Sequence, residues 1–318
     1  MGPMSPTDSE ASLFGTPWTR ATKEDGSAMY PDYLPFYDPH KKPPNLLKKT
    51  TKVIDLSPHI GTEVEGVELS QLTPAGLDEL ALYATKRGAI AQTKIVRHFG
   101  PLHVHGWAPH PTAGSPEHMT IYDRKEGLSP VQWHTDQSPE PQPLRMTVIY
   151  MLESPAPAQR ASRTLSPRFR KRLEGLTAIH SNKEGVTQEK ANNGTNAAVR
   201  RQELIQEHPV VLVHPVTGEK ALYVNPVYTK RNAGFDGEES DYLFSFLFDH
   251  IAKRQDFQCR VRYEAGTVLV WDQRVTNHSQ TLDYPAGDRR HALRLTSLVN
   301  NPIPARVEED DGECAKDY

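Results

Sequence analysis

The stretch 258-QCRVRYEAGTVLVWDQRVTNH-278 decides the fold class. Residues 258–263 and 267–271 are rich in β-branched and aromatic side chains, and they flank a turn at Ala265-Gly266. This pattern is typical of two antiparallel strands. Similar runs recur at short intervals along the chain, at 53–56, 64–69, 146–152, 210–213, 221–224 and 291–298. Many short strands and few helices predict a mainly β sandwich or barrel with flanking helices, and they exclude a doubly wound sheet.

Three segments predict the flanking helices. Thr73-Pro74 begins one helix that Arg87-Gly88 ends, because Thr caps, Pro fits the first turn and Gly fits the last. Residues 166–173 form a second. The third, 238–252, is amphipathic, and we expect these residues on its apolar side: Tyr242, Leu243, Phe246, Leu247, His250 and Ile251. Residues 216–219 predict the turn of a hairpin between 210–213 and 221–224.

Proline and charge divide the chain into three parts. Proline is densest early in the chain, with 8 of the 27 in the first 50 residues, and residues 1–50 are predicted to form a polar, Pro-rich arm. The folded domain is expected at 51–302. Residues 303–318 form an acidic tail.

Composition excludes several classes of protein. There are 37 Lys plus Arg against 40 Asp plus Glu, which gives no electrostatic case for nucleic acid as a partner. Neither a secretory leader nor a run of 18 apolar residues is recognisable, so we expect no membrane span and a cytoplasmic protein. Cys259 and Cys314 stand alone, which excludes a disulfide framework or a cysteine-based zinc site.

The run Trp133-His134-Thr135-Asp136 is a candidate metal site. Residues i and i+2 of a strand point the same way, so His134 and Asp136 can bind one ion. His278 is the candidate third ligand, and two His with one carboxylate leave positions open, as in non-haem Fe(II) sites. Taken alone, these motifs are more often loop, capping or structural residues. A zinc hydrolase is a further alternative.

Two arginines follow the third candidate ligand. Arg290, Ala292 and Arg294 share one face of the predicted strand. Each guanidinium offers a planar fork of donors for a carboxylate or sulfonate. The alternative is a solvated strand face that pairs with Asp283 or Asp288.

These motifs together resemble the TauD/TfdA family of Fe(II)- and 2-oxoglutarate-dependent dioxygenases. The resemblance covers about residues 52–300, and its motifs follow the order of the family: His134-x-Asp136, Trp271-Asp272-x-Arg274-x-Thr276-x-His278 and Arg289-Arg290-x-x-x-Arg294, with further matches at 99–105, 165–169 and 214–225. It implies a double-stranded β-helix, or jelly roll. Asp272 and Arg274 are expected to pair and brace the loop of His278, whereas His103, His214 and His250 are expected to be structural.

The resemblance also implies roles for individual residues. His134, Asp136 and His278 would bind Fe(II). Arg290 would bind the cosubstrate 2-oxoglutarate, with Thr164 as a further candidate. His105 and Arg294 would hold the primary substrate, a small anion such as a sulfonate, sulfate ester or carboxylate; taurine catabolism is one process that the family serves. The implied reaction consumes O2, hydroxylates that substrate and yields succinate and CO2. A homo-oligomer is left open.

Two segments look shorter than the family pattern, 89–98 and 156–164. The first lacks a recognisable strand, and the second replaces a segment whose Thr helps to bind 2-oxoglutarate. The alternative function is therefore a catalytically impaired jelly-roll homologue that binds a ligand or partner.

Overall fold

The computed structural model describes residues 50, 52–57, 60–67, 69–87, 96, 99–105, 117–123, 132–153, 158–161, 165–187, 203–254, 257–261, 263–280, 290–298 and 302–305. Residues 1–49 of the predicted arm and nearly all of the acidic tail lie outside these residues, as does Thr164. In the described part of the chain, no helix is long and apolar enough to cross a membrane.

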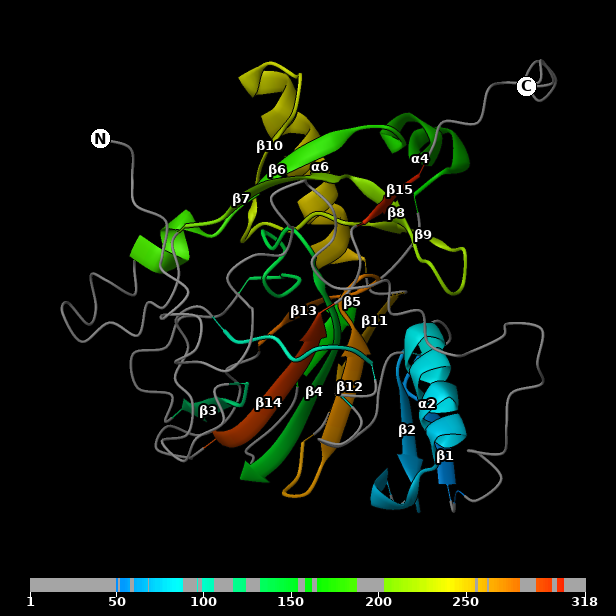
Figure 1. The fold of residues 1–318 in the computed structure, drawn as a ribbon. Coiled ribbons are helices and arrows are strands. Elements are labelled where there is room, and N and C mark those ends of the chain that lie inside the picture. Colours follow the sequence, from blue (N-terminus) through cyan, green and yellow to red (C-terminus); the bar gives the residue numbers. More distant parts are fainter. Residues whose placement is uncertain are drawn as a thin grey trace, which may run out of the picture.

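A four-stranded antiparallel sheet lies in the lower half of the molecule in Figure 1. Its order is β12 (Val268–Asp272), β4 (Leu144–Glu153), β14 (Arg290–Leu298) and β3 (Met119–Asp123). Alternate residues of β4 face opposite sides of this sheet, as the period of a strand requires. Met146 and Val148 pack in one hydrophobic cluster, and Ile149 and Met151 in another. Because both faces of the sheet are covered, most residues of β4 are apolar.

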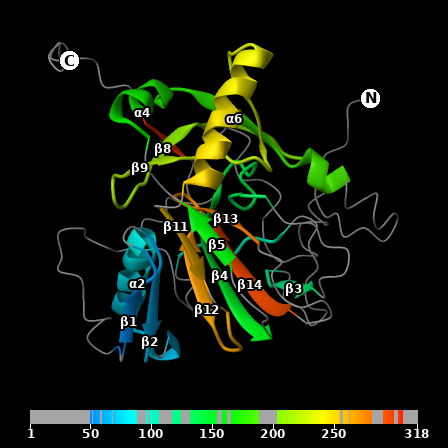
Figure 2. The same cartoon turned by 180° about the vertical axis from the view of Figure 1, so that it is seen from behind.

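Helix α2 (Pro74–Arg87) covers the first of these faces, near β12 (Figure 2). Leu77 and Leu80 of α2 pack with Phe99 and Val270. The hairpin of β1 (Lys52–Asp55) and β2 (Thr62–Glu65) lies beside α2. The predicted run at 64–69 is interrupted, because β2 ends at Glu65 and Leu69–Gln71 forms the 3-10 turn η2.

Short antiparallel sheets complete the fold. In the first, β6 (Thr177–Ser181) lies between β7 (Ile205–Pro209) and β10 (Thr229–Asn232). In the second, β8 (Val211–Val213) lies between β9 (Lys220–Leu222) and β15 (Ile303–Pro304). In the third, β5 (Ala158–Ala161) lies between β11 (Gln258–Val261) and β13 (Asn277–Ser279). The β8–β9 hairpin confirms the predicted turn at 216–219. The fold is mainly β with flanking helices, a jelly roll, as predicted.

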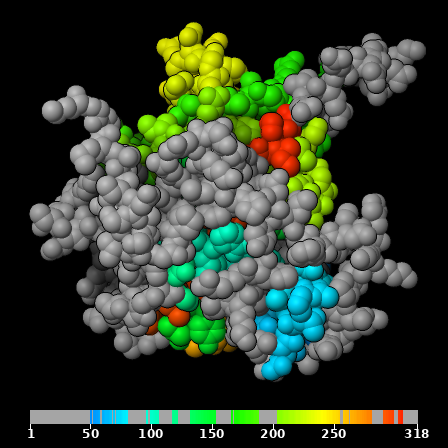
Figure 3. Space-filling model, in the orientation of Figure 1, coloured from blue at the N-terminus to red at the C-terminus, as the bar shows by residue number. Residues whose placement is uncertain are grey.

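Two helices lie on the upper sheets, α4 (Pro167–Leu173) and α6 (Gly237–Lys253), close to their predicted bounds. The predicted apolar side of α6 is partly wrong. Tyr242 and Phe246 are 79% and 50% exposed, and Figure 3 shows α6 (yellow) at the molecular surface. The buried residues are Ser240, Phe244, Leu247, His250 and Ile251. The buried face of α6 therefore includes Phe244 in place of Phe246. Both residues are phenylalanine in an aromatic segment, so the apolar pattern of the sequence does not choose between them.

A buried polar cluster lies under β6 and β7. The rings of His180 and His208 are 5.5 Å apart, and both stand against Tyr223. Burial lowers the pKa of His208 to about 4, and it also lowers the pKa of His180 well below its usual range. Both imidazoles are therefore neutral in the folded protein at pH 7.

The protein should lose stability as the pH falls from about 6.5 toward 4. In this window the unfolded chain binds a proton at His208 that the folded protein excludes, so folding becomes less favourable by on the order of 2 kcal/mol. Melting temperatures measured between pH 7.5 and 4.5 test this. A His208→Gln variant should show a shallower decline, and equal slopes for the two proteins would contradict the assignment.

Candidate metal centre

Backbone pairing brings two of the predicted ligands together. His134 and His278 form an antiparallel bridge, in which each backbone N–H donates to the carbonyl of the other at 2.8 Å. Their side chains consequently leave the backbone on the same side, with ring centroids 4.2 Å apart. His278 lies on β13, which pairs with β5 through His278↔Arg160. Thus the segment at 156–164, expected to be shortened, still supplies a strand behind the third ligand.

Asp136 completes a compact triad. One Asp136 oxygen lies 3.5 Å from His134 Nε2, the other lies 3.5 Å from His278 Nε2, and one ligand atom from each residue lies within 4.8 Å of the others. No second group of this kind occurs among the described residues. His134 Nδ1 donates to the carbonyl of Gln132 at 2.8 Å, which leaves the lone pair on Nε2 for a metal. This donor set fits a divalent ion with open coordination positions.

The electrostatics of Asp136 also suit a metal ligand. Its side chain is buried, which alone would raise the pKa, but the charge of Arg294 beside it holds the pKa well below its usual range. The group is therefore a carboxylate at neutral pH. A deprotonated oxygen is the form that binds a metal ion.

Both predicted arginines are buried on β14. Arg290 and Arg294 are 8% and 7% exposed, so this strand face is not solvated, whereas the alternative partners Asp283 and Asp288 lie outside the described residues. The Nη2 atom of Arg294 lies 2.6 Å from Asp136 Oδ2, which places this guanidinium beside the triad. Arg290 is four residues earlier on the same face, a backbone separation of about 13 Å.

His105 reaches the site through a residue that the sequence analysis missed. Gln137 Nε2 lies 3.0 Å from His105 Nε2 and 3.3 Å from the Tyr228 hydroxyl. Gln137 directly follows the ligand Asp136 and has a φ of 46°, a backbone conformation that side chains other than Gly seldom adopt. The sequence feature that could have indicated Gln137 is its position directly after the predicted ligand Asp136. Such strain is frequent near functional sites.

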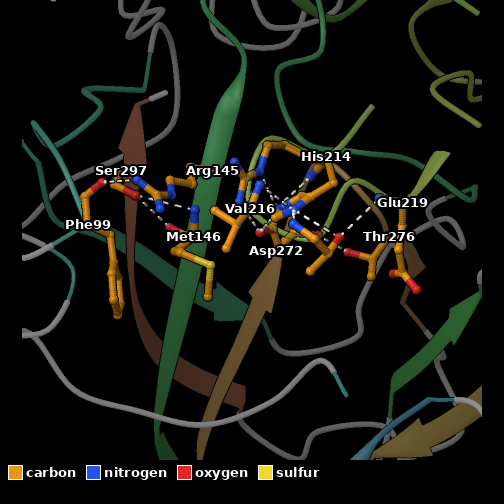
Figure 4. A network of polar contacts seen from close by, with 11 residues as sticks. Phe99, Arg145, Met146, His214, Val216, Glu219, Asp272, Thr276 and Ser297 are labelled. Atoms are coloured by element: carbon orange, nitrogen blue, oxygen red, sulfur yellow. Dashed lines mark hydrogen bonds and ion pairs between the residues drawn. The ribbon is translucent and has the colours of Figure 1, made fainter. Parts of the chain in front are cut away.

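A buried network braces the loop that precedes His278 (Figure 4). Arg274 Nε donates to Asp272 at 2.8 Å, and His214 Nε2 donates to the other oxygen of the same carboxylate at 3.1 Å. The Thr276 hydroxyl donates to the Asp272 carbonyl at 2.7 Å. The predicted pairing of Asp272 with Arg274 is confirmed, and His214, expected only as a structural residue, is its third member. Trp271, beside this network, places its ring 5.1 Å from that of His278.

Comparison with known proteins identifies relatives of this arrangement. A family model described as "Taurine catabolism dioxygenase TauD, TfdA family" matches residues 52–296. The alpha-ketoglutarate-dependent dioxygenase cnsP of Penicillium expansum is 61% identical, with 94% of each chain covered. The alpha-ketoglutarate-dependent sulfonate dioxygenase of Saccharomyces cerevisiae is 30% identical over 87% of this chain and 79% of its own.

A solved structure has the same fold. It is the crystal structure of a putative alpha-ketoglutarate-dependent taurine dioxygenase from Burkholderia xenovorans, with a TM-score of 0.65 and 27% identity over 80% of this chain and 94% of its own. The alignment with the cnsP protein spans 349 positions, more than the 318 residues of this chain, so the relative has residues where this chain has none. That this chain is shortened at 89–98 and 156–164 stays a prediction, because most of these residues lie outside the described part of the chain.

Proposed function

Since the chain belongs to the TauD/TfdA family of alpha-ketoglutarate-dependent dioxygenases, we propose that it uses Fe(II) and 2-oxoglutarate to hydroxylate a small anionic organic substrate. The observation that carries this proposal is the convergence of His134, Asp136 and His278 within 4.8 Å. Overall, 2-oxoglutarate, O2 and the C–H form of the substrate give succinate, CO2 and the hydroxylated product.

The three ligands would hold Fe(II), which when bound supplies the redox chemistry of O2 that side chains lack. The chain itself orients the groups around it. The Gln132 carbonyl fixes the tautomer of His134, and the network of Asp272 fixes the backbone that carries His278. Geometry held in this way is what an open metal site requires of its protein.

The charges near the triad favour anionic ligands. The carboxylate of Asp136 balances only half the charge of a divalent ion, and two buried guanidiniums add further positive charge. A dianionic cosubstrate leaves a net positive site, which can accept one more anion. We assign the distal carboxylate of 2-oxoglutarate to Arg290, with Thr164 as a further contact, and the primary substrate to Arg294 and His105. The name of the yeast relative, a sulfonate dioxygenase, supports a sulfonate or sulfate ester as that substrate.

The remaining assignments follow from the same proposal. The partners are small molecules, O2 among them, and the protein works in the cytoplasm without nucleic acid or membrane. The competing proposal is a catalytically impaired homologue. One observation favours it: this chain lacks residues that the cnsP protein has.

The function is tested by succinate release from the purified full chain with Fe(II), O2 and 2-oxoglutarate. We expect slow release without a primary substrate, and faster release with an accepted member of a panel of alkylsulfonates, sulfate esters and carboxylates. Omitting Fe(II) or O2 should stop it. No release under any of these conditions would reject the dioxygenase and favour the impaired homologue.

Substituting the two arginines separates their roles. Arg290→Ala should raise the KM for 2-oxoglutarate about 10- to 100-fold, because a charge-assisted pair contributes about 1.5–3 kcal/mol. Arg294→Ala should impair stimulation by the primary substrate more than it affects that KM. Arg170→Ala, an exposed position on α4, is the control and should change neither. The inverted pattern would refute the assignment of roles.

A further inference from the structure

The carboxylate of Asp136 is held at one of its two oxygens. Oδ2 accepts a short hydrogen bond from Gln273 Nε2 and an ion pair from Arg294 Nη2 at 2.6 Å. Oδ1 lies 3.5 Å from His134 Nε2, and Oδ2 lies equally far from His278 Nε2, but only Oδ2 carries the two donors. The two oxygens of this metal ligand therefore have different surroundings.

Gln273 contacts the backbone of Asp136 as well as its side chain. Its Oε1 accepts the Asp136 backbone N–H at 3.2 Å, so one carboxamide holds two parts of the same residue. Its Nε2 also donates to the Thr147 hydroxyl at 2.7 Å, and its own backbone N–H donates to the Arg145 carbonyl at 2.7 Å. Because Thr147 and Arg145 belong to β4, Gln273 ties Asp136 to the central sheet. Gln273 is 0% exposed, so water does not compete for these bonds.

This arrangement limits how Asp136 can bind a metal. A carboxylate has two oxygens with about four lone-pair sites, and two donors already occupy Oδ2. We propose that Gln273 is a positioning residue that commits Asp136 to bind Fe(II) through Oδ1 alone. The chain would then supply three ligand atoms to the ion, which would leave positions open for 2-oxoglutarate and O2. This inference rests on the proposed function and adds a residue to its machinery.

Gln273 and Arg294 act on the same oxygen in different ways. Arg294 carries a charge and holds down the pKa of Asp136, whereas Gln273 is neutral and contributes direction. Loss of Gln273 frees one side of Oδ2, so that Asp136 can turn and occupy a second position on the ion. That position is one that 2-oxoglutarate needs. The expected defect is thus weaker cosubstrate binding even when the metal site is saturated.

The test compares two buried substitutions in the full chain. Gln273→Met keeps the volume but removes both contacts with Asp136. Thr147→Val, the matched control, removes the second partner of Gln273 Nε2 and a hydrogen bond between the Thr147 and Thr296 hydroxyls, but leaves both contacts of Gln273 with Asp136. Fe(II) affinity and the Kd for 2-oxoglutarate at saturating Fe(II) are measured anaerobically, with melting temperatures alongside. Gln273→Met should weaken Fe(II) binding about 10- to 100-fold, the usual effect of losing a partner of a metal ligand, and should weaken 2-oxoglutarate binding further. Thr147→Val should stay within about threefold of wild type.

Two results would overturn the proposal: a Gln273→Met protein with both affinities unchanged, or equal losses in the two variants, which would reveal a packing effect. If Gln273→Met does not fold, Gln273→Asn replaces it, because the same carboxamide on a shorter side chain falls short of Asp136. Wild-type protein that binds neither Fe(II) nor 2-oxoglutarate would instead reject the proposed function. The two failures are therefore distinguishable.

Discussion

Replacing His134 by Ala is expected to reduce succinate formation to background. The substitution removes one of three ligand atoms that lie within 4.8 Å of one another, and the remaining pair holds a divalent ion far more weakly. Because every step of the proposed reaction depends on the ion, no partial activity should remain. The measurement is succinate released per enzyme, with Fe(II) and 2-oxoglutarate at saturating concentrations for the wild type.

A matched histidine supplies the control. His250 lines the surface groove between α4 and α6, to which no triad residue contributes. His250→Ala should retain the activity of the wild type, although it removes a buried side chain of α6. Turnover that persists in His134→Ala would sink the assignment of the metal centre.

Arg274→Ala should be the most destabilising of the substitutions considered. The Asp272 carboxylate is 0% exposed and accepts two side-chain hydrogen bonds from Arg274. Burial alone would raise its pKa, and Arg274 is the main group that holds the pKa well below its usual range. Removing one partner of a buried pair costs about 3–5 kcal/mol, because the other charge is left uncompensated. A domain has only about 5–15 kcal/mol of stability.

Urea unfolding of wild type, Arg274→Ala and the double variant Arg274→Ala/Asp272→Asn measures this effect. The double variant should recover part of the loss, since it removes the uncompensated charge. The pKa of Asp272 is lower in the folded protein than in the unfolded chain, where it is about 3.9. In the wild type, the pairing of Asp272 with Arg274 therefore stabilises the fold above about pH 3.9, and this stabilisation is lost as the pH falls further. A loss below about 1 kcal/mol in Arg274→Ala would contradict this account of the network.

The sequence predicts the parts of the fold that depend on local pattern. Helix α2 and the β8–β9 hairpin are found close to where caps, turns and strand periods place them. The triad is also predictable, since the i and i+2 spacing of His134 and Asp136 is local and the family motifs add His278. The buried face of α6 is not, because Phe244 and Phe246 are equally apolar and only packing against the sheets selects one of them.

Contacts between distant segments could not be predicted from spacing. Gln273 and Asp136 are 137 positions apart, and nothing in either neighbourhood indicates that a carboxamide meets the metal ligand. The same holds for Arg294, whose predicted partner was a substrate anion and whose contact in the structure is Asp136. Gln273 directly follows β12 and Arg294 lies on β14, the two strands that flank β4, and the bridge between His134 and His278 brings Asp136 beside them. Apart from the position of Gln273 beside Asp272, no feature of the neighbouring sequence indicates either contact with Asp136.

The most direct test of the central claim is an anaerobic titration of the Fe(II)-loaded full chain with 2-oxoglutarate, followed by visible absorption. We predict a charge-transfer band that rises to saturation in the wild type and is missing in His134→Ala, because the cosubstrate must bind to an ion that these three side chains hold. Wild-type protein that takes up Fe(II) but develops no band with 2-oxoglutarate, or a band that survives in His134→Ala, would contradict the claim.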